Sequence, residues 1–459
     1  MADRFSVLIM AAGLGTRMRS ELPKVLHPVA GKAMVDWVID AARGAGAGEV
    51  VCIVRPGDGV ADGLSDGVQI AEQQQGEGTG SAVLAARDRL ESGGTFVVLS
   101  GDHPLVSGEL VEELVAAHRR EKAVATVLTT SDLDPTGYGR IVRGEDGAVE
   151  QIVETKYPDR APQEALDIRE INVGTYVFEG PELVKALEQV DPIDGEIHLT
   201  ETFPLLAASG GRVAGRETHD VCSALGVNSR VDLMEAERLA QKRLIEQHAL
   251  AGVTFLSPET TMIEAGVEIG EDTTIGSGVT LRGATRIGKS CELGPQSTLI
   301  DATVRDGVRA PHSYLLECEV KDDATIGPFA YLRPGTVVHE GAKVGTFVEL
   351  KNSQIGPGAK VPHLSYIGDA DVGEDSNLGA STITANYDGR KKHRTKLGKR
   401  VKTGVHTSLV APLDVGDGAY TGAGSAITED IPEDALGIAR PRQTNIEGYA
   451  QRAEEESRE

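Results

Sequence analysis

The chain has 459 residues and a formal net charge of −24, from 46 lysines and arginines against 70 aspartates and glutamates. This length predicts two or three domains with sizeable cores, and 40% apolar with 25% charged residues excludes a disordered chain. The acidity argues against a protein that coats nucleic acid or an anionic membrane. No run approaches the roughly 18 apolar residues of a membrane span.

Residues 1–228 alternate apolar runs with amphipathic segments. The segment MVDWVIDAAR has helical spacing, and four runs have the composition of buried strands: SVLIM, VVCIV, TFVVLS and VATVLTT. This alternation predicts an α/β domain with a partly parallel sheet, whose ligands bind at the carboxyl ends of the strands.

Two features bear on the compartment. The first apolar run is short enough for a signal peptide, but Asp3 precedes it and Arg17 follows, so we interpret it as a buried strand. Four widely separated cysteines form no CxxC pair: Cys52, Cys222, Cys291 and Cys318. They predict unpaired, reduced thiols in a cytoplasmic protein.

Residues 229–250 predict a connecting helix. Ser229, with Asp232 three residues later, has the pattern of an N-terminal cap, and Gly252 is a suitable stop. Four apolar residues recur at helical spacing, and we expect this stripe to be buried by packing: Leu233, Ala236, Ala240 and Leu244.

From residue 251 onward the apolar period becomes six residues. Uninterrupted series run from Ile269 to Leu299, from Val320 to Leu350 and from Leu397 to Ile427, and the pattern resumes one residue early at Ile355. A period of six is that of hexapeptide repeats, each of which supplies one short strand of a parallel β-helix with about 18 residues per coil. Residues 251–459 therefore predict a left-handed parallel β-helix, whose handedness is a known exception to the usual crossover rule.

A basic segment, NYDGRKKHRTK, interrupts the repeat between Thr384 and Leu397. Because it is polar, we expect it to project from the prism of strands. It is either a disposable insertion or part of a site between neighbours, and its concentrated positive charge in an acidic chain favours the second interpretation.

The segment AAGLGTRM follows the first predicted strand, and ELPKVLH comes shortly after it. Small residues let a backbone approach phosphate closely, and Arg17 and Lys24 supply charge. The dinucleotide pattern fails because Met18 occupies the final glycine position, and the P-loop pattern fails because no GK[ST] follows. On this loop alone, a phosphate site and a plain strand–turn–helix junction are equally supported.

Asp102 comes directly after the predicted strand TFVVLS. An acid in this place is suited to hold Mg²⁺ on a triphosphate. Alternatively, Asp102 caps the turn that Pro104 favours.

In the second half, polar residues recur at roughly one-coil intervals, which predicts that they share one face of the prism: Arg333, Lys351, His363 and Tyr366. A guanidinium and an ammonium suit a phosphate monoester, and an imidazole suits a general base for an amine. On periodicity alone, a histidine that only makes structural hydrogen bonds is the better interpretation.

Ordered motifs extend this picture. AAGLGTRM…LPKVLH, GEGTG, GD, GYGRI, IVE, INVG and GVN resemble the sugar-1-phosphate nucleotidylyltransferases. FAYLRPG, GTFVELKNSQIG, VPHLSYIGDA and NLGASTITANYDG resemble the acetyltransferase half of the bifunctional N-acetylglucosamine-1-phosphate uridyltransferase/glucosamine-1-phosphate acetyltransferase family. The resemblance covers nearly the whole chain, apart from the tail AEEESRE.

The resemblance implies a Rossmann-like nucleotidyltransferase domain over 1–228, a linker helix over 229–250 and an acetyltransferase β-helix over 251–459. It implies two reactions: N-acetylation of glucosamine-1-phosphate by acetyl-CoA, then Mg²⁺-dependent uridylyl transfer from UTP to N-acetylglucosamine-1-phosphate. The product is UDP-N-acetylglucosamine for envelope synthesis. It also implies a homotrimer, with acetyltransferase sites that lie between subunits.

For uridylyl transfer, positioning and charge stabilisation suffice without a protein nucleophile. The resemblance implies that Arg17 neutralises the leaving pyrophosphate and that the phosphates and nucleotide are held by Ala11, Ala12, Gly13 and Lys24. The implied uracil contacts are Gln73, Gly78 and Thr79, the sugar contacts are Gly139, Glu154, Asn172 and Gly174, and the Mg²⁺ ligands are Asp102 and Asn228. Glu77 and Ser81 depart from the family pattern beside the base-reading loop.

For acetyl transfer, the resemblance implies that His363 deprotonates the amine and that Arg333 and Lys351 hold the sugar phosphate. The residues implied to position sugar and acetyl group are Tyr366, Asn377, Asn386 and Tyr387, and those implied to contact acetyl-CoA are Ala380, Val405, Ala423 and Arg440. Val405 and His406 stand where the family has Ser-Asp, so Val405 is either accommodated through its backbone or reshapes the acyl pocket. Ser381 replaces a commoner glycine.

Two other functions remain open from the sequence. One is a monofunctional nucleotidylyltransferase whose β-helix only trimerises. The other is a hexapeptide-type zinc hydrase, which requires imidazoles that converge on a metal; its candidates are His312, His339 and His363.

Overall fold

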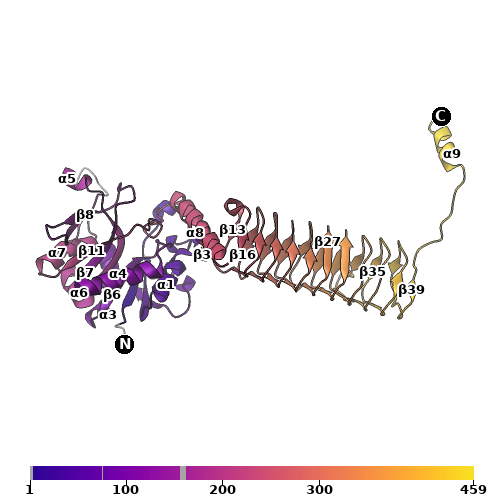
Figure 1. Cartoon of the computed structure of the whole chain (residues 1–459), viewed down its shortest axis with the longest axis horizontal. Coiled ribbons are helices and arrows are strands. Elements are labelled where there is room, and N and C mark those ends of the chain that lie inside the picture. Colours follow the sequence, from indigo (N-terminus) through magenta and orange to yellow (C-terminus); the bar gives the residue numbers. More distant parts are fainter. Residues whose placement is uncertain (1–3, 75, 156–161, 459) are drawn as a thin grey trace. The chain divides into compact units, whose positions relative to one another are not determined.

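The computed structural model describes residues 4–74, 76–155 and 162–458. The chain divides into two compact units, Met1–Arg243 and Leu244–Glu459, and each is described by itself (Figure 1). Among the described helices, none is long and apolar enough to cross a membrane. All four cysteines are free, as predicted.

The first unit is built on a mixed sheet with the strand order β11-β7-β10-β6-β1-β4-β5, to which β8 and β9 are attached. Strand β1 lies parallel to both β4 and β6, whereas β10 runs antiparallel to β6 and β7. The four predicted strands are confirmed. The strands are β1 (Ser6–Met10), β4 (Glu49–Val54), β5 (Gln69–Glu72), β6 (Thr95–Ser100), β7 (Ala125–Thr130), β8 (Arg140–Arg143), β9 (Val149–Val153), β10 (Ile171–Glu179) and β11 (Val213–Glu217).

Helices cover both faces of this sheet. Val7 and Ile9 of β1 pack in one core with α1 (Met34–Gly44) and α4 (Gly108–Glu121). Leu8 faces the opposite core, whose helices are α2 (Thr79–Leu84), α3 (Arg87–Glu91), α6 (Gly180–Leu187) and α7 (Thr202–Ala208). A strand buried on both faces reads as a continuous apolar run, which explains the SVLIM signal.

Helix α8 (Arg230–Leu250) confirms the predicted connecting helix. The Asp232 carboxylate accepts hydrogen bonds from the amides of Asn228 (2.9 Å) and Ser229 (2.8 Å), so it caps the helix start as expected. Gly252 follows its end with a φ of +95°. In the predicted stripe, Ala236, Ala240 and Leu244 are buried and Leu233 is half-buried.

The second unit is a parallel β-helix of three sheets (Figure 1). Ile275 pairs in register with Leu293, three hexapeptides further along the chain, whereas Val338 pairs with Ile355, which falls one residue short of that spacing. These pairings confirm the coil length and the one-residue shortening at Ile355. The repeating aliphatic side chains, such as that of Ile275, are fully buried inside the prism.

The seven-stranded sheet contains β12 (Thr254–Phe255), β15 (Thr274–Ile275), β18 (Glu292–Leu293), β21 (Arg309–Ala310), β24 (Thr325–Ile326), β27 (Lys343–Thr346) and β30 (Lys360–His363). The ten-stranded sheet contains β13 (Met262–Ile263), β16 (Thr280–Arg282), β19 (Thr298–Ile300), β22 (Tyr314–Leu316), β25 (Tyr331–Leu332), β28 (Glu349–Lys351), β31 (Tyr366–Gly368), β33 (Ile383–Ala385), β35 (Ser408–Val410) and β38 (Ala426–Ile427). The nine-stranded sheet contains β14 (Glu268–Ile269), β17 (Arg286–Ile287), β20 (Thr303–Val304), β23 (Glu319–Val320), β26 (Val337–Val338), β29 (Gln354–Ile355), β32 (Ala370–Val372), β34 (Thr395–Leu397) and β36 (Leu413–Val415).

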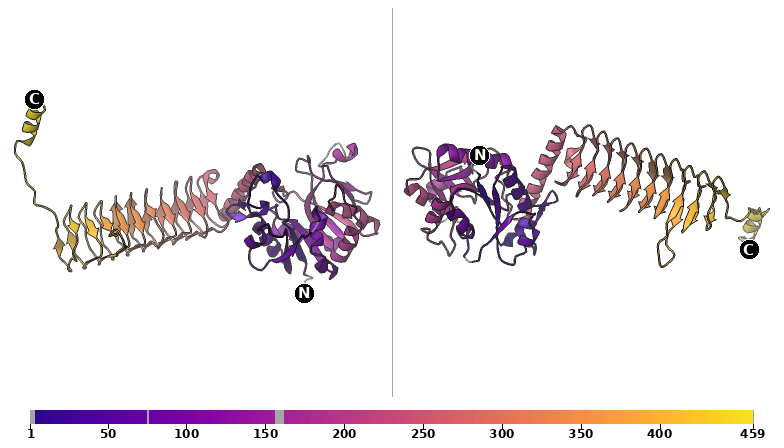
Figure 2. Two further views of the ribbon diagram at one scale, coloured as in Figure 1. Left: turned by 180° about the vertical axis from the view of Figure 1, so that it is seen from behind. Right: turned by 90° about the horizontal axis from the view of Figure 1, so that it is seen from below.

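One coil is longer than the rest. Ala370 pairs with Thr395, a spacing longer than four hexapeptides, and the extra residues form a loop, 386–394, between β33 and β34. This loop projects from the stack of coils, as predicted, in the orange-to-yellow part of the ribbon (Figure 2). Because the excess is confined to a corner, the following strands keep their register.

Candidate active sites

The carboxyl ends of β1, β4 and β6 open into a cleft of about 260 Å³. The turn after β1 runs beside β4, since the Ala11 amide donates to the Ile53 carbonyl (2.9 Å). Seven predicted nucleotide residues line this cleft: Ala12, Gly13, Lys24, Gln73, Gly78, Thr79 and Asp102. The fold therefore brings together residues from four separate segments.

Two glycines permit close approach around the cleft. A Cβ on Gly78, whose φ is +94°, would lie 2.4 Å from the Ile197 carbonyl oxygen. A Cβ on Gly15, whose φ is +59°, would lie 2.6 Å from Lys24 Cβ. Both backbones adopt conformations that favour glycine, so a side chain at either position would displace the cleft wall.

Lys24 links the predicted metal ligands. Its Nζ donates to Asp102 Oδ2 and, at 3.3 Å, to Asn228 Oδ1, which also accepts a hydrogen bond from Arg17 (2.9 Å). The two oxygens therefore converge on one point that already attracts a cationic group. Carboxylate and amide oxygens are the ligands that Mg²⁺ prefers, so this donor set fits the metal.

Asp102 is ionised in this setting. Burial raises the pKa of its carboxyl, but the charges of His103 and Lys24 and the hydrogen bonds from Lys24 and Ser100 outweigh burial and hold the pKa below its usual range. Burial lowers the pKa of His103. The negative charge of Asp102 is therefore stabilised by both neighbours, His103 and Lys24.

The predicted sugar contacts form a second group beside His103. The backbone amide of Asn172 donates to the Gly139 carbonyl (2.9 Å), and the side-chain Oδ1 of Asn172 accepts from the backbone amide of Gly174 (2.9 Å). Glu154 Oε1 accepts from Thr200 (3.1 Å) and lies 3.6 Å from the position of a Cβ on Gly139. A Cβ on Gly174 would lie 3.7 Å from His103 Cε1. All four predicted residues are thus neighbours.

Sequence reasoning missed Arg55 and His103. Arg55 lines the cleft, and its Nε donates to the Ala12 carbonyl (2.6 Å). Its position directly after β4 was the available signal, because β1 and β4 are parallel and end at one edge. By contrast, Glu77 and Ser81 do not line the cleft, and the Ser81 hydroxyl donates to the Glu77 carbonyl (3.0 Å).

In the β-helix, four predicted residues occupy equivalent positions on successive coils, which we call the 363–423 column: His363, Ala380, Val405 and Ala423. The Ser381 amide donates to the His363 carbonyl (3.2 Å), the His406 amide to the Ala380 carbonyl (2.8 Å), and the Gly424 amide to the Val405 carbonyl (2.9 Å). Arg440 Cδ lies 4.0 Å from the position of a Cβ on Gly424, at the end of the column. The His363 side chain is exposed.

Lys351 and Tyr366 lie on the ten-stranded sheet, where Tyr331, Glu349 and Tyr366 are in register, and Arg333 comes directly after strand β25 of the same sheet. The prediction that His363 shares their face is wrong, because β30 belongs to the seven-stranded sheet. His363 follows Lys351 by two hexapeptides, which is only two thirds of a coil. It therefore lies across a corner from Tyr366.

The projecting loop adds a cation that sequence reasoning did not single out, Lys392. The adjacent side-chain amino group of Lys392 is the main cause that lowers the pKa of Lys351, with burial and the charge of Arg333 adding to it, while Asp369 opposes the shift. Arg333 also pairs with Glu349 (2.7 Å). Two adjacent ammonium groups form an attractive site for a phosphate.

The remaining predicted residues surround this group. Asn386 is buried, and its Nδ2 donates to Asp369 Oδ2 (2.6 Å) and lies 3.5 Å from the Tyr366 hydroxyl. Tyr387 is exposed, with its hydroxyl bonded to the Gly389 carbonyl (2.8 Å). Asn377 is bridged to Lys360 on the preceding coil, three residues before Ala380.

The three histidines of the zinc hypothesis do not converge. His339 bonds to Gln354 (3.1 Å) along the nine-stranded sheet, whereas His312 lies against the Phe329 ring and His363 is on β30. Within the described part of the chain, no group of three or more His, Cys, Asp or Glu side chains is arranged to hold a metal ion.

Comparisons with known proteins agree with this geometry. Residues 7–190 match the model of the MobA-like NTP transferase domain. A solved structure of UDP-glucose pyrophosphorylase complexed with UDP-glucose covers 52% of this chain and 99% of its own, but its TM-score of 0.43 and identity of 18% are too low to bear on function.

Two curated relatives match nearly the full length. The bifunctional protein GlmU of Mycolicibacterium vanbaalenii is 44% identical, covering 97% of this chain and 93% of its own. The bifunctional protein GlmU of Caldanaerobacter subterraneus subsp. tengcongensis is also 44% identical, covering 97% of each chain. With both cleft and β-helix included in these matches, the chain belongs to the family of bifunctional GlmU proteins.

Proposed function

We propose that the two reactions of this bifunctional enzyme are divided between its two halves, with uridylyl transfer in residues 1–228 and acetyl transfer in residues 251–459, joined by the helix 229–250. The chain is a glucosamine-1-phosphate N-acetyltransferase and a UDP-N-acetylglucosamine diphosphorylase. The observation that carries the division is that each half gathers its own set of predicted residues, one in the cleft and one around the 363–423 column.

In the cleft, UTP lies against the Ala11–Gly13 turn, with its base at Gln73, Gly78 and Thr79. N-acetylglucosamine-1-phosphate lies beside Gly139, Glu154, Asn172 and Gly174. A phosphate oxygen of the sugar attacks the α-phosphorus and pyrophosphate leaves, while Lys24 and Arg17 stabilise the developing negative charge.

Asp102 and Asn228 hold Mg²⁺, in keeping with the convergence of their oxygens. When bound, the ion supplies positive charge to the triphosphate and its leaving group. Lys24, whose Nζ contacts Asp102, would present its ammonium to the phosphates beside this site.

In the β-helix, Arg333, Lys351 and Lys392 hold the phosphate of glucosamine-1-phosphate, while Tyr366, Asn377, Asn386 and Tyr387 position the sugar and acetyl group. His363 takes a proton from the 2-ammonium group. The free amine attacks the thioester carbonyl, the C–S bond breaks, and the proton that the nitrogen loses as the amide forms is taken up by the departing CoA thiolate. Acetyl-CoA lies along Ala380, Val405 and Ala423, with Arg440 at its phosphates.

The protein acts as a homotrimer in the cytoplasm. Supporting the trimer, one corner of the β-helix exposes an apolar stripe of Phe329, Phe347 and Leu364, which are 53%, 59% and 58% exposed. The two phenylalanine rings stack at 5.5 Å. Association with further copies of this chain buries this stripe.

The test is CoA release from acetyl-CoA and glucosamine-1-phosphate by the wild type and by His363→Ala. We expect release that requires the amine and falls by about 10²–10⁴ in His363→Ala. Pyrophosphate formation from UTP and N-acetylglucosamine-1-phosphate should be unchanged in the variant, which controls for folding. Unimpaired release by His363→Ala would contradict the assigned base.

A further inference from the structure

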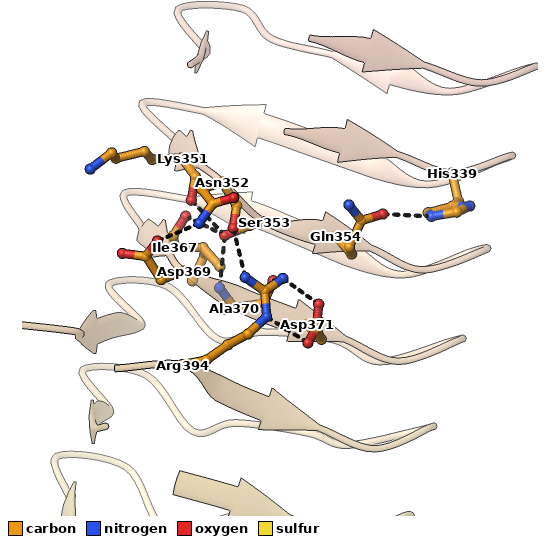
Figure 3. Close-up of polar contacts among 10 residues, drawn as sticks. All are labelled: His339, Lys351, Asn352, Ser353, Gln354, Ile367, Asp369, Ala370, Asp371 and Arg394. Atoms are coloured by element: carbon orange, nitrogen blue, oxygen red, sulfur yellow. Dashed lines mark hydrogen bonds and ion pairs between the residues drawn. The ribbon is translucent and has the colours of Figure 1, made fainter. Parts of the chain in front are cut away.

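Asp369 is a buried carboxylate, 7% exposed, at the corner between β31 and β32. Both of its oxygens accept hydrogen bonds from side-chain amides, Oδ1 from Asn352 and Oδ2 from Asn386, each at 2.6 Å. Figure 3 shows the first of these contacts beside Lys351. A buried carboxylate with two amide donors is a fixed acceptor for both.

Asp369 also contacts both ends of the projecting loop. Its side chain holds Asn386, where the loop begins, and its backbone carbonyl accepts from the Thr395 amide (3.1 Å), just after the loop ends. Next to it, the Arg394 guanidinium makes a two-point pair with Asp371 and donates to the Asn352 carbonyl (3.1 Å) (Figure 3). The loop is therefore anchored at its base on this corner.

The contact fixes the orientation of the Asn386 amide. Because Nδ2 donates to Asp369 and lies 3.5 Å from the Tyr366 hydroxyl, Oδ1 on the other side of the amide is left as an acceptor. The same loop carries Lys392, which is near enough to Lys351 to lower the pKa of that lysine. The side-chain acceptor at position 369 therefore fixes the amide orientation, and it adds to the backbone and Arg394 contacts that hold the loop base.

The corner itself does not require a carboxylate. Equivalent positions on the preceding coils, all with positive φ, are occupied by Asp301, Glu317, Gly335 and Asn352. Asp301 is exposed, and its carboxylate accepts only from the Ala284 backbone amide (2.8 Å). Acidic, amide and glycine residues thus all adopt the conformation of this turn. The two amide contacts of Asp369 are therefore not needed to form the corner.

We propose that Asp369 is a positioning residue for acetyl transfer, which orients Asn386 toward the sugar and anchors the loop that carries Lys392. This inference rests on the proposed role of Asn386 in binding glucosamine-1-phosphate. Asp369 does not contact the reacting atoms and acts through Asn386.

The test compares Asp369→Asn with Asp301→Asn as the matched corner control, in the full-length protein. In Asp369→Asn one oxygen becomes an NH₂ group that faces an amide donor, so we expect KM for glucosamine-1-phosphate to rise about tenfold. KM for acetyl-CoA and the uridyltransferase rate should stay unchanged. Asp301→Asn should behave as the wild type in all assays.

A double-mutant cycle separates positioning from general destabilisation. If Asp369 acts through Asn386, Asp369→Asn adds little to the defect of Asn386→Ala, whereas a merely structural role gives additive losses. Additive losses, or an Asp369→Asn enzyme with wild-type KM beside an impaired Asn386→Ala, would overturn this inference alone. A fully active Asn386→Ala enzyme would overturn both it and the proposed role of Asn386. Should Asp369→Asn fail to fold, Asp369→Glu, which keeps the charge but moves the oxygens, is assayed in the same way.

Discussion

Lys351 and Lys392 lie close together although both side chains carry positive charge. The neighbouring ammonium group lowers the pKa of Lys351, so Lys351 loses its proton at a lower pH than an ordinary lysine. A bound sugar phosphate favours the protonated form and relieves the repulsion. Affinity for glucosamine-1-phosphate should therefore weaken as pH rises through the lowered pKa.

Lys392→Gln removes the cause of this shift. We expect KM for glucosamine-1-phosphate to rise at neutral pH, because one cation is lost, and its alkaline increase to move to higher pH, because the pKa of Lys351 returns toward its usual value. A series of KM measurements between about pH 7 and 10 tests both effects. The exposed Lys391, in the same loop, provides the control as Lys391→Gln. If the alkaline rise in KM occurs at the same pH in Lys392→Gln as in the wild type, Lys351 titrates independently of Lys392.

Individual site residues could be predicted where they belong to motifs that occur along the chain in the same order as in the family. The resemblance gave Lys24, Asp102 and Asn228, and the fold brings them together. Lys392 and Arg55 were not identified, because their importance depends on which strand end or corner lies beside them. The loop around Lys392 was nevertheless identified from the sequence by its concentrated positive charge.

At the scale of elements, the start of α8 serves both the helix and the cleft. Asp232 caps the helix and also accepts from the Asn228 amide, whose side chain bonds to Arg17 and Lys24. Substitution at Asp232 should therefore affect stability and uridylyl transfer together.

We expect Asp232→Ala to lower the free energy of unfolding by about 1 kcal/mol and to reduce the uridyltransferase rate, with acetyl transfer unaffected. Thermal unfolding and pyrophosphate release are the measurements. Asp232→Asn keeps a capping oxygen and should retain most of both properties. Equal losses in the two variants would show that the carboxylate charge, and not the cap, is what matters.

The six-residue period predicted the β-helix because every sixth side chain must point into a narrow prism, and Ile275 and Leu293 do so. It also located the shortened coil at Ile355 and the interruption after Thr384. The face of His363 was predicted wrongly, since the two hexapeptides between Lys351 and His363 turn the chain through two corners. The six-residue period shows which side chains point into the prism. To assign a strand to one of the three sheets, the hexapeptides must also be counted from the nearest break in the repeat.

For the whole molecule, we expect the exposed corner stripe to determine the state of assembly. Phe329 and Phe347 stack on each other but remain more than half exposed in the single chain. If copies of the chain cover them, polar replacements there should weaken association more than folding.

The double substitution of Phe329→Ser and Phe347→Ser should shift the sedimentation mass from three chains toward one and lower acetyl transfer, whose site we expect to lie between subunits. Uridylyl transfer should persist. Met234→Ser changes a 72% exposed residue of helix α8, outside the stack of coils, and is the control. A trimer that survives the double substitution would assign its interface elsewhere on the chain.

The regular stack of coils also sets fixed distances along the β-helix. Neighbouring strands lie about 4.8 Å apart, so the four coils of the 363–423 column mark off about 14 Å between their first and last residues. If His363 is the base and Arg440 binds the CoA phosphates, as we propose, the separation between them is set by a whole number of coils. Removing one coil would then leave the cross-section intact but shorten this separation by one strand spacing, so the number of repeats would help to determine the length of thioester carrier that the enzyme accepts.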